Sequence, residues 1–412
     1  MSRSFAEASA ALHHLADLAV DPKQVERVTE RVGAERVAER GAQAVAFQAL
    51  PLMEKFCAPA GQTAPDLAVV MADGGRLQIR ERAPAPAVPA PCLPTSEPAA
   101  PAPEPTWDEE PEAAAGHWRE DKVALLLTMA SAVSAADPCP DIPASFVDVV
   151  RIPKLARQLK RNAPVQEDAV LDSDEPEAAA EALREGVYQP PQVLTRQVVA
   201  SRGRWQAFAP LVATAAWALA LQGAPRRAFV GDGAANNWKL QRRFFGSFVP
   251  ILDFIHALSY VFAAAMAGRK FAAGWTCYRQ WISWVWQGNV SRVIAALHER
   301  QAELGLPDPD EAETSPRQVV AKALTYLENH QDKMQYAAYR QAGLPITSSL
   351  MESAVKQINQ RVKGTEKFWS EAGSEAVLQL RADQLSDGEP LEAFWARRQA
   401  AATGQRRYRR AG

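Results

Sequence analysis

Three acidic residues that lie far apart in the 412-residue chain have side chains of the type that binds divalent cations. Asp73 precedes two glycines, Asp232 stands between two glycines, and Glu352 follows a loop at the start of a helical pattern. If folding brings the three carboxylates together, they can hold two metal ions about 3.5–4 Å apart, as in phosphodiester displacement. Carboxylate oxygens favour Mg²⁺ or Mn²⁺ over Zn²⁺. The residue types therefore predict metal-dependent phosphoryl transfer, with water or a DNA 3′-hydroxyl as the nucleophile.

A further acid and a histidine accompany Asp232. The apolar run 228–230 predicts a buried strand that ends just before Asp232, and a second run, 248–252, ends at Asp253. Neighbouring strands of an α/β sheet bring such residues to one edge, so we expect Asp253 to lie near Asp232. His256 follows three residues later. A histidine at a helix start that only packs against Asp253 would have the same spacing.

Each of these acids also has a purely structural interpretation. Asp73-Gly74-Gly75 is typical of a hairpin turn, in which aspartate is favoured for backbone reasons alone. Ser349 and Glu352 fit the S-x-x-E capping box, in which Glu352 would accept a hydrogen bond from the Ser349 backbone N–H. Only the combination of the acids, in this order along the chain, favours a metal site.

The elements that must position these acids are those of an α/β fold. We predict a hairpin with strands 67–71 and 77–79, a buried strand at 122–129, and an apolar helix over 205–221. A long helical block, 256–329, separates Asp253 from Glu352, and its four tryptophans are expected to pack in its core rather than stack on bases. Residues 144–161 are expected to contain helix, and the acidic stretch 166–185 a loop followed by helix. We expect His298 and His330 to lie at the surface.

The sequence of the N-terminal region predicts three short helices. Apolar spacing predicts helices over 4–19, from Pro22 to Val32, and over 34–50, with the second helix ending at Gly33. The second helix would present Lys23, Arg27 and Arg31 outward. A short helix, a tight turn and a basic helix are compatible with a helix-turn-helix DNA reader, but also with a plain three-helix bundle.

Composition narrows the class of protein. The chain is 47% hydrophobic and 23% charged, which is ordinary for globular domains, and it has no apolar run of about 18 residues and no signal-like N-terminus. The four cysteines are widely spaced, which argues against a zinc site or a disulfide framework and suits a cytosolic protein. A net charge of −2 gives no global case for nucleic acid, although arginines crowd the last residues. That tail is either a phosphate-binding arm or a solubilising end.

Several segments together resemble the insertion-sequence transposases of the DDE type, closest to the ISKra4-like group. The segments that carry the resemblance, in chain order, are VDPKQVERVTERVG at 20–33, GDGA at 231–234, ILDFIH at 251–256, GLPITSSLMESAVKQINQRVKG at 343–364 and FWSEAGSEAVLQLRA at 368–382. The chain departs from the family at Asn236-Asn237, which stand where the family places an aromatic residue sooner after GDGA. The Pro-rich stretch after the first hairpin is a second departure.

The resemblance implies an RNase H-like mixed sheet flanked by helices, with Asp73, Asp232 and Glu352 as the catalytic acids and ligands of two Mg²⁺ or Mn²⁺ ions. It implies that Asp253 and His256 match a D-x-x-H signature, to which we assign a supporting role near the scissile phosphate or a flipped base. Basic residues beside the site, Lys356, Arg361 and Lys363, would neutralise DNA phosphates.

The resemblance also implies a domain organisation and a set of partners. The expected parts are a helical DNA-binding region (1–62), the first part of the catalytic domain (63–257, with a disordered Pro/Ala-rich excursion at 82–115), an all-helical insertion (258–340), the last part of the catalytic domain (341–390) and an Arg-rich tail (391–412). The implied partners are transposon ends, target DNA and further copies of the chain, in a bacterial cytoplasm. Two alternatives remain, which are an inactive or shortened copy that only binds DNA and a structure-selective nuclease of the same fold.

Overall fold

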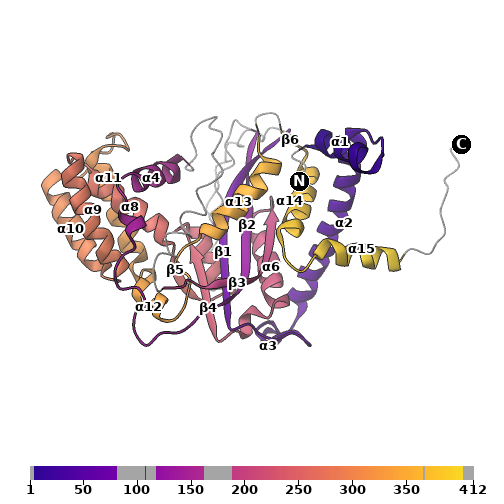
Figure 1. Cartoon of the computed structure of the whole chain (residues 1–412), viewed down its shortest axis with the longest axis horizontal. Coiled ribbons are helices and arrows are strands. Elements are labelled where there is room, and N and C mark those ends of the chain that lie inside the picture. Colours follow the sequence, from indigo (N-terminus) through magenta and orange to yellow (C-terminus); the bar gives the residue numbers. More distant parts are fainter. Residues whose placement is uncertain (1–3, 81–106, 108–116, 162–187, 365–366, 402–412) are drawn as a thin grey trace, which may run out of the picture.

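The computed structural model of the chain describes residues 4–80, 107, 117–161, 188–364 and 367–401. A mixed sheet forms its centre, with strands in the order β3-β2-β1-β4-β5 and β6 pairing β1 (Figure 1). The strands are β1 (Leu67–Ile79), β2 (Trp118–Ala130), β3 (Gln192–Ser201), β4 (Arg226–Gly231), β5 (Val249–Leu252) and β6 (Phe368–Trp369). The pairs β1–β2 and β2–β3 are antiparallel, whereas β1–β4, β4–β5 and β1–β6 are parallel. The predicted α/β class with a mixed sheet is confirmed.

The predicted hairpin around Asp73 is wrong. β1 continues through Asp73, Gly74 and Gly75 as one extended strand, and its antiparallel partner is β2, which includes the predicted strand 122–129. Neither glycine has the positive φ that a tight type I′ turn requires. A long antiparallel partner satisfies the backbone of the whole segment, so pairing across the sheet overrides the local turn preference of Asp-Gly-Gly.

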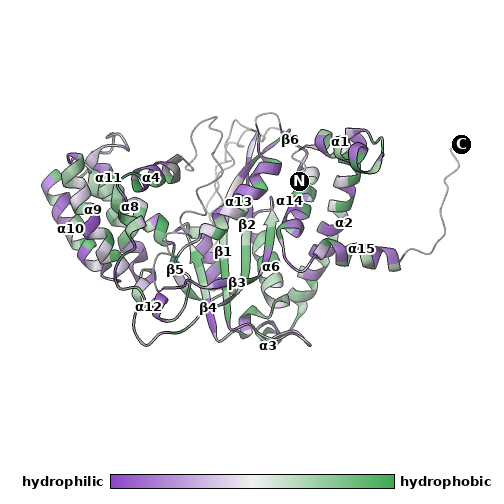
Figure 2. Cartoon of the chain, viewed as in Figure 1, coloured by the Kyte–Doolittle hydropathy of each residue, from purple (hydrophilic) through white to green (hydrophobic). Residues whose placement is uncertain are grey.

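Helices cover both faces of the sheet. Asp121 and Lys122 are consecutive on β2 and point to opposite faces. Asp121 lies against Gly75 beside Asn359 of α13 (Ser349–Val362), whereas the Lys122 ammonium lies over the Trp205 ring of α6 (Trp205–Ala218). The strands between these layers are largely hydrophobic (Figure 2), and the central residues of β1, β2 and β4 are fully buried.

The predicted helical block is confirmed, and it stands at the β5 end of the sheet (Figure 1). Its helices are α8 (Phe254–Met266), α9 (Phe271–Trp286), α10 (Val290–Leu304) and α11 (Pro316–His330), followed by α12 (Tyr336–Gln341). Trp281 and Trp286 are buried in its core, as expected. His330 is buried as well, so its predicted surface location is wrong; its Nδ1 bonds the Tyr326 carbonyl one helical turn back.

The N-terminal helices differ from the prediction. After α1 (Phe5–Ala16), a single helix, α2 (Pro22–Ala49), continues straight through Gly33, so the tight turn of a helix-turn-helix is missing. Gly33 is buried against α14 (Glu371–Leu385), where a Cβ would come within 2.5 Å of the Ala376 carbonyl oxygen. The glycine therefore permits close helix packing instead of ending the helix.

The C-terminal segment is also more ordered than a plain tail. α15 (Pro390–Ala400) carries Arg397 and Arg398, which pair with Glu39 and Glu35 of α2. The remaining short elements of the described residues are α3 (Leu52–Lys55), α4 (Arg151–Arg161), α7 (Ala235–Phe244) and the 3₁₀ turns Ala144–Val147, Leu221–Gly223 and Gln331–Lys333. The helix expected within 144–161 is thus confirmed. Predictions for 82–115 (apart from Trp107), 166–185 and 402–412 fall outside the described residues.

No helix in the described part of the chain combines the length and the apolar character needed to cross a membrane.

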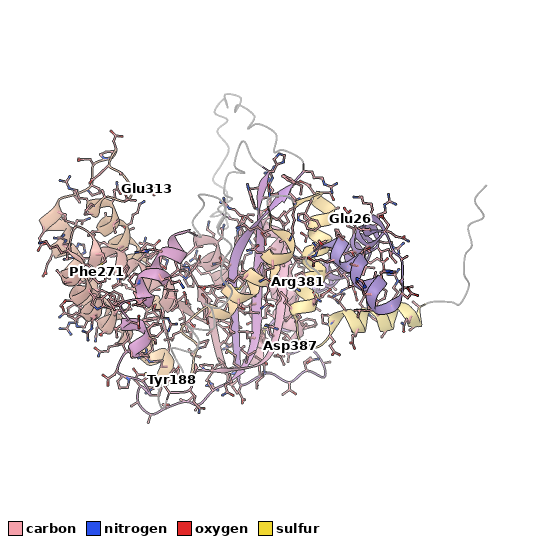
Figure 3. The ribbon with its side chains drawn as sticks, turned by 45° about the horizontal axis from the view of Figure 1, so that its top comes forward. Glu26, Tyr188, Phe271, Glu313, Arg381 and Asp387 are labelled. Atoms are coloured by element: carbon pink, nitrogen blue, oxygen red, sulfur yellow. The ribbon has the colours of Figure 1, made fainter. Side chains whose placement is uncertain are left out.

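The helical block and the N-terminal helices lie at opposite ends of the sheet (Figure 1). Figure 3 marks the helical block with Phe271 and Glu313, and the N-terminal helices with Glu26.

Candidate functional site

Strand register brings three aspartates to one level of the sheet. Met71 of β1 lies beside Val230 of β4, and Val230 lies beside Ile251 of β5. Two residues further along each parallel strand stand Asp73, Asp232 and Asp253. The expectation that neighbouring strands deliver Asp232 and Asp253 to one edge is therefore confirmed, and Asp73, which lies within β1 instead of in the predicted turn, stands at the same level.

Asp253 is fully buried and joins three segments. Its Oδ2 accepts hydrogen bonds from the His256 backbone N–H at 3.0 Å and from the His256 ring Nδ1 at 2.6 Å. Its Oδ1 accepts from the Ser348 N–H at 2.7 Å, immediately before α13. Asp253 thus caps α8, orients the His256 ring and fixes the start of the helix that carries Glu352.

Glu352 faces this pair from α13. Single ligand atoms of Asp253, His256 and Glu352 all lie within 4.8 Å of one another. The capping-box interpretation of Glu352 is wrong, because the helix begins one residue earlier, with Ser348 as its N-cap and no side-chain cap. The carboxylate is therefore not engaged at the helix start and faces the other acids.

The electrostatics link all of these groups. Burial, the charge of Asp232 and the charge of Glu352 raise the pKa of Asp73 to about 7, although the Gly74 N–H and His256 oppose the change. Burial and the charge of Asp253 likewise raise the pKa of Glu352 to about 7. Burial lowers the pKa of His256, but its bond to Asp253 and the charges of Asp232 and Glu352 outweigh this and raise it to about 10. Like charges brought together out of water favour the uptake of protons or cations.

The grouping of the predicted site residues differs in detail from the prediction. The tightest set is Asp253, His256 and Glu352, so the two residues assigned a supporting role lie closest to the third acid. Strand register places Asp73 and Asp232 side by side, and the charges of Asp232 and Glu352 both raise the pKa of Asp73.

Asp232 sits in a tightly held turn. Its Oδ1 accepts from the Ala234 N–H and from Asn237 Nδ2, both at 2.9 Å. Asn237 is buried on α7 and supplies a donor to this acid. Within the described residues, no lysine or arginine forms an ion pair with Asp73, Asp232 or Glu352. These carboxylate oxygens are of the type that could hold Mg²⁺ or Mn²⁺.

The predicted DNA-binding residues occupy different environments. Lys356 lies one turn from Glu352 and lowers its pKa, and Lys363 is exposed near the other end of α13. Arg361 instead lies over the rings of Phe5 and Trp369, where it packs α1 against the sheet. On α2, Arg27 and Arg31 are exposed, and Lys23 pairs with Glu26 at 2.7 Å.

Sequence reasoning missed a second buried acid, Asp121. It lies opposite Gly75 on β2, and a Cβ on Gly75 would be 2.8 and 2.9 Å from its carboxylate oxygens and 3.0 Å from Asn359 Oδ1. Among the described residues, these three oxygens have no hydrogen-bonding partner outside their own residue. The only signal was the charged triplet Glu120-Asp121-Lys122 beside an apolar run.

No family model matches the sequence, and comparisons with curated proteins and with solved structures give no match.

Proposed function

We propose that the chain is a DDE transposase with an RNase H-like catalytic domain, which cuts DNA at transposon ends and joins them to target DNA. The observation that carries this proposal is the common level of Asp73, within β1, and of Asp232 and Asp253, directly after the parallel strands β4 and β5, with Glu352 facing them from α13. The resemblance of the segments around Asp232, Asp253 and Glu352 to such transposases adds independent support.

In this proposal, Asp73, Asp232 and Glu352 would hold two divalent ions, which would supply Lewis-acid chemistry for phosphodiester displacement. The bond that His256 Nδ1 donates to Asp253 fixes the ring and leaves Nε2 as its other donor. The raised pKa of His256 keeps the ring cationic at neutral pH, so it can donate a hydrogen bond to a phosphate oxygen. Lys356 adds a positive charge one turn along α13.

The surroundings of the site suit a DNA substrate held at several points. Arg27 and Arg31 give α2 an exposed basic stripe, although α2 lacks the turn of a helix-turn-helix. We assign this stripe to contacts with DNA phosphates, which position a duplex without reading its sequence. Paired transposon ends would require at least two copies of the chain.

The test is an end-cleavage assay with Mg²⁺ or Mn²⁺ on DNA that carries the terminal repeats flanking the gene. Asp73→Ala, Asp232→Ala and Glu352→Ala should each abolish cleavage and leave DNA binding measurable. Glu313→Ala, which removes an exposed acid in the helical block, is the matched control and should cleave normally. Normal activity in any of the three site variants removes that residue from the site.

The same assay separates the two alternatives. Binding to terminal repeats without metal-dependent cleavage would identify an inactive DNA-binding copy. Cleavage of branched or hybrid substrates without preference for the terminal repeats would identify a structure-selective nuclease, for which the same carboxylates would serve.

A further inference from the structure

Tyrosines of the helical block donate hydrogen bonds to the backbone at the ends of the acid-bearing strands. Tyr326 of α11 donates to the Asp232 carbonyl at 2.7 Å, directly after β4. Tyr336 of α12 donates to the Leu252 carbonyl at 3.0 Å, the last residue of β5. One hydroxyl thus bonds Asp232 itself, and the other bonds the residue before Asp253.

Tyr326 holds the Asp232 turn by packing as well as by hydrogen bonding. Gly233 has a φ of +103°, and a Cβ there would lie 2.7 Å from Tyr326 Cε2. The ring therefore closes directly over the glycine while the hydroxyl bonds the preceding carbonyl. Since Asp232 Oδ1 is already held by Ala234 and Asn237, the Tyr326 contact completes the restraint of this acid.

The tyrosine is itself rigidly placed. Its ring stacks on Tyr260 of α8, with ring centroids 3.8 Å apart and an interplanar angle of 11°. His330, one turn further along α11, bonds the Tyr326 carbonyl and lies beside the Trp238 ring of α7. The turn at Asp232 is therefore tied to three helices of different parts of the chain.

A buried tyrosine that bonds a backbone carbonyl has a simpler explanation, which is that any buried hydroxyl needs an acceptor. Tyr278 of α9 illustrates this case, because it donates to the Phe146 carbonyl at the same 2.7 Å and is fully buried. Its acceptor carries no acid of the site. The two hydrogen bonds have the same length, but only the acceptor of Tyr326 belongs to a residue of the proposed metal site.

We propose that Tyr326 is a positioning residue, through which the helical block sets the orientation of the Asp232 carboxylate for metal binding. This inference rests on the proposed metal site. Groups that orient a ligand without touching the metal commonly change metal affinity by about 10–100-fold. The helical block would then be part of the site's architecture rather than an appendage between its acids.

The experiment compares Tyr326→Phe with Tyr278→Phe in the full chain. Each variant loses one hydroxyl whose bond to a backbone carbonyl has the same length, although Tyr326 is half-buried and Tyr278 is fully buried. The free energy of unfolding of each variant is therefore measured beside its Mn²⁺ affinity. We expect Mn²⁺ binding, measured by calorimetry without DNA, to weaken about tenfold in Tyr326→Phe and to stay unchanged in Tyr278→Phe. Hydrogen exchange should accelerate in residues 232–237 of Tyr326→Phe only.

The outcomes separate the inference from the proposed function. Equal Mn²⁺ affinity and equal exchange in the two variants would overturn the positioning role while the metal site stands. If the wild-type chain binds no Mn²⁺, the proposed function fails; faster exchange at 232–237 in Tyr326→Phe would then still support the restraint of the turn, and unchanged exchange would reject it.

Discussion

Two acids, the half-buried Asp73 and the fully buried Asp121, project from neighbouring strands toward α13, yet their surroundings differ. Register places both on one face of the sheet, since Asp73 lies opposite Val123 and Gly75 lies opposite Asp121. The pKa of each is raised to about 7, and burial is the largest cause for both. Asp73 faces further carboxylates, whereas Asp121 faces the amide oxygen of Asn359.

The two regions therefore differ in how the negative charge of their carboxylates can be neutralised. Several carboxylates converge in the first region, and the charges of His256 and Lys356 offset theirs only in part. In our proposal, divalent cations supply the remaining positive charge. A single carboxyl group beside one amide oxygen needs only a proton, which Asp121 can donate to Asn359 Oδ1. The first region therefore suits chemistry, and the second suits the attachment of α13 to β1 and β2.

The largest expected effect comes from replacing acids by their amides in the two regions. Asp232→Asn should lower metal-dependent cleavage by about 10²–10³-fold or more, because it removes a charged ligand without changing shape. Asp121→Asn should cleave within about twofold of the wild-type rate. A comparable loss of activity in Asp121→Asn would erase the distinction between the regions.

The second effect is on stability and its dependence on pH. The folded chain raises the pKa of Asp121, so protonated Asp121 contributes stability that is complete below about pH 4 and is lost as pH rises through about 7. Asp121→Asn removes this loss and provides an N–H for Asn359. The variant should gain about 2–4 kcal/mol in free energy of unfolding at pH 8 and little at pH 4, as measured by urea denaturation. Identical pH profiles for variant and wild type would contradict a neutral Asp121.

The third effect tests the close approach at Gly75. Gly75→Ala should destabilise the fold by about 1–3 kcal/mol, because its Cβ would meet three oxygens at 2.8–3.0 Å. Gly74→Ala is the matched control on the same strand, since its nearest contact is the flexible Glu120 carboxylate at 3.3 Å. Equal thermal midpoints for the two variants would show that α13 can move away from β1 without cost.

The smallest effect is the pH dependence of metal binding. Protons compete with metal for Asp73 and Glu352, whose pKa values are about 7, so raising the pH from 6 to 8 should tighten Mn²⁺ binding by about tenfold. Calorimetry in two buffers of different ionisation enthalpy would also detect the released protons. An affinity that does not change over this range would place the metal away from these acids.

The sequence was sufficient to predict those strands and helices whose pattern of apolar residues is local. The strands before Asp232 and Asp253, the helical block and the helix of Glu352 all follow from apolar periodicity and flanking glycines. The common edge of Asp232 and Asp253 followed from the general rule for neighbouring parallel strands.

Features that depend on distant partners could not be predicted from the sequence. The segment around Asp73 is a strand because β2 pairs with it, and Gly33 lies within a helix because α14 packs against it. The closeness of Asp253 and His256 to Glu352 depends on the Ser348 bond, and the bond of Tyr326 to the Asp232 turn joins residues 94 positions apart. Local preferences amount to about 1 kcal/mol per residue, so long-range pairing and packing override them.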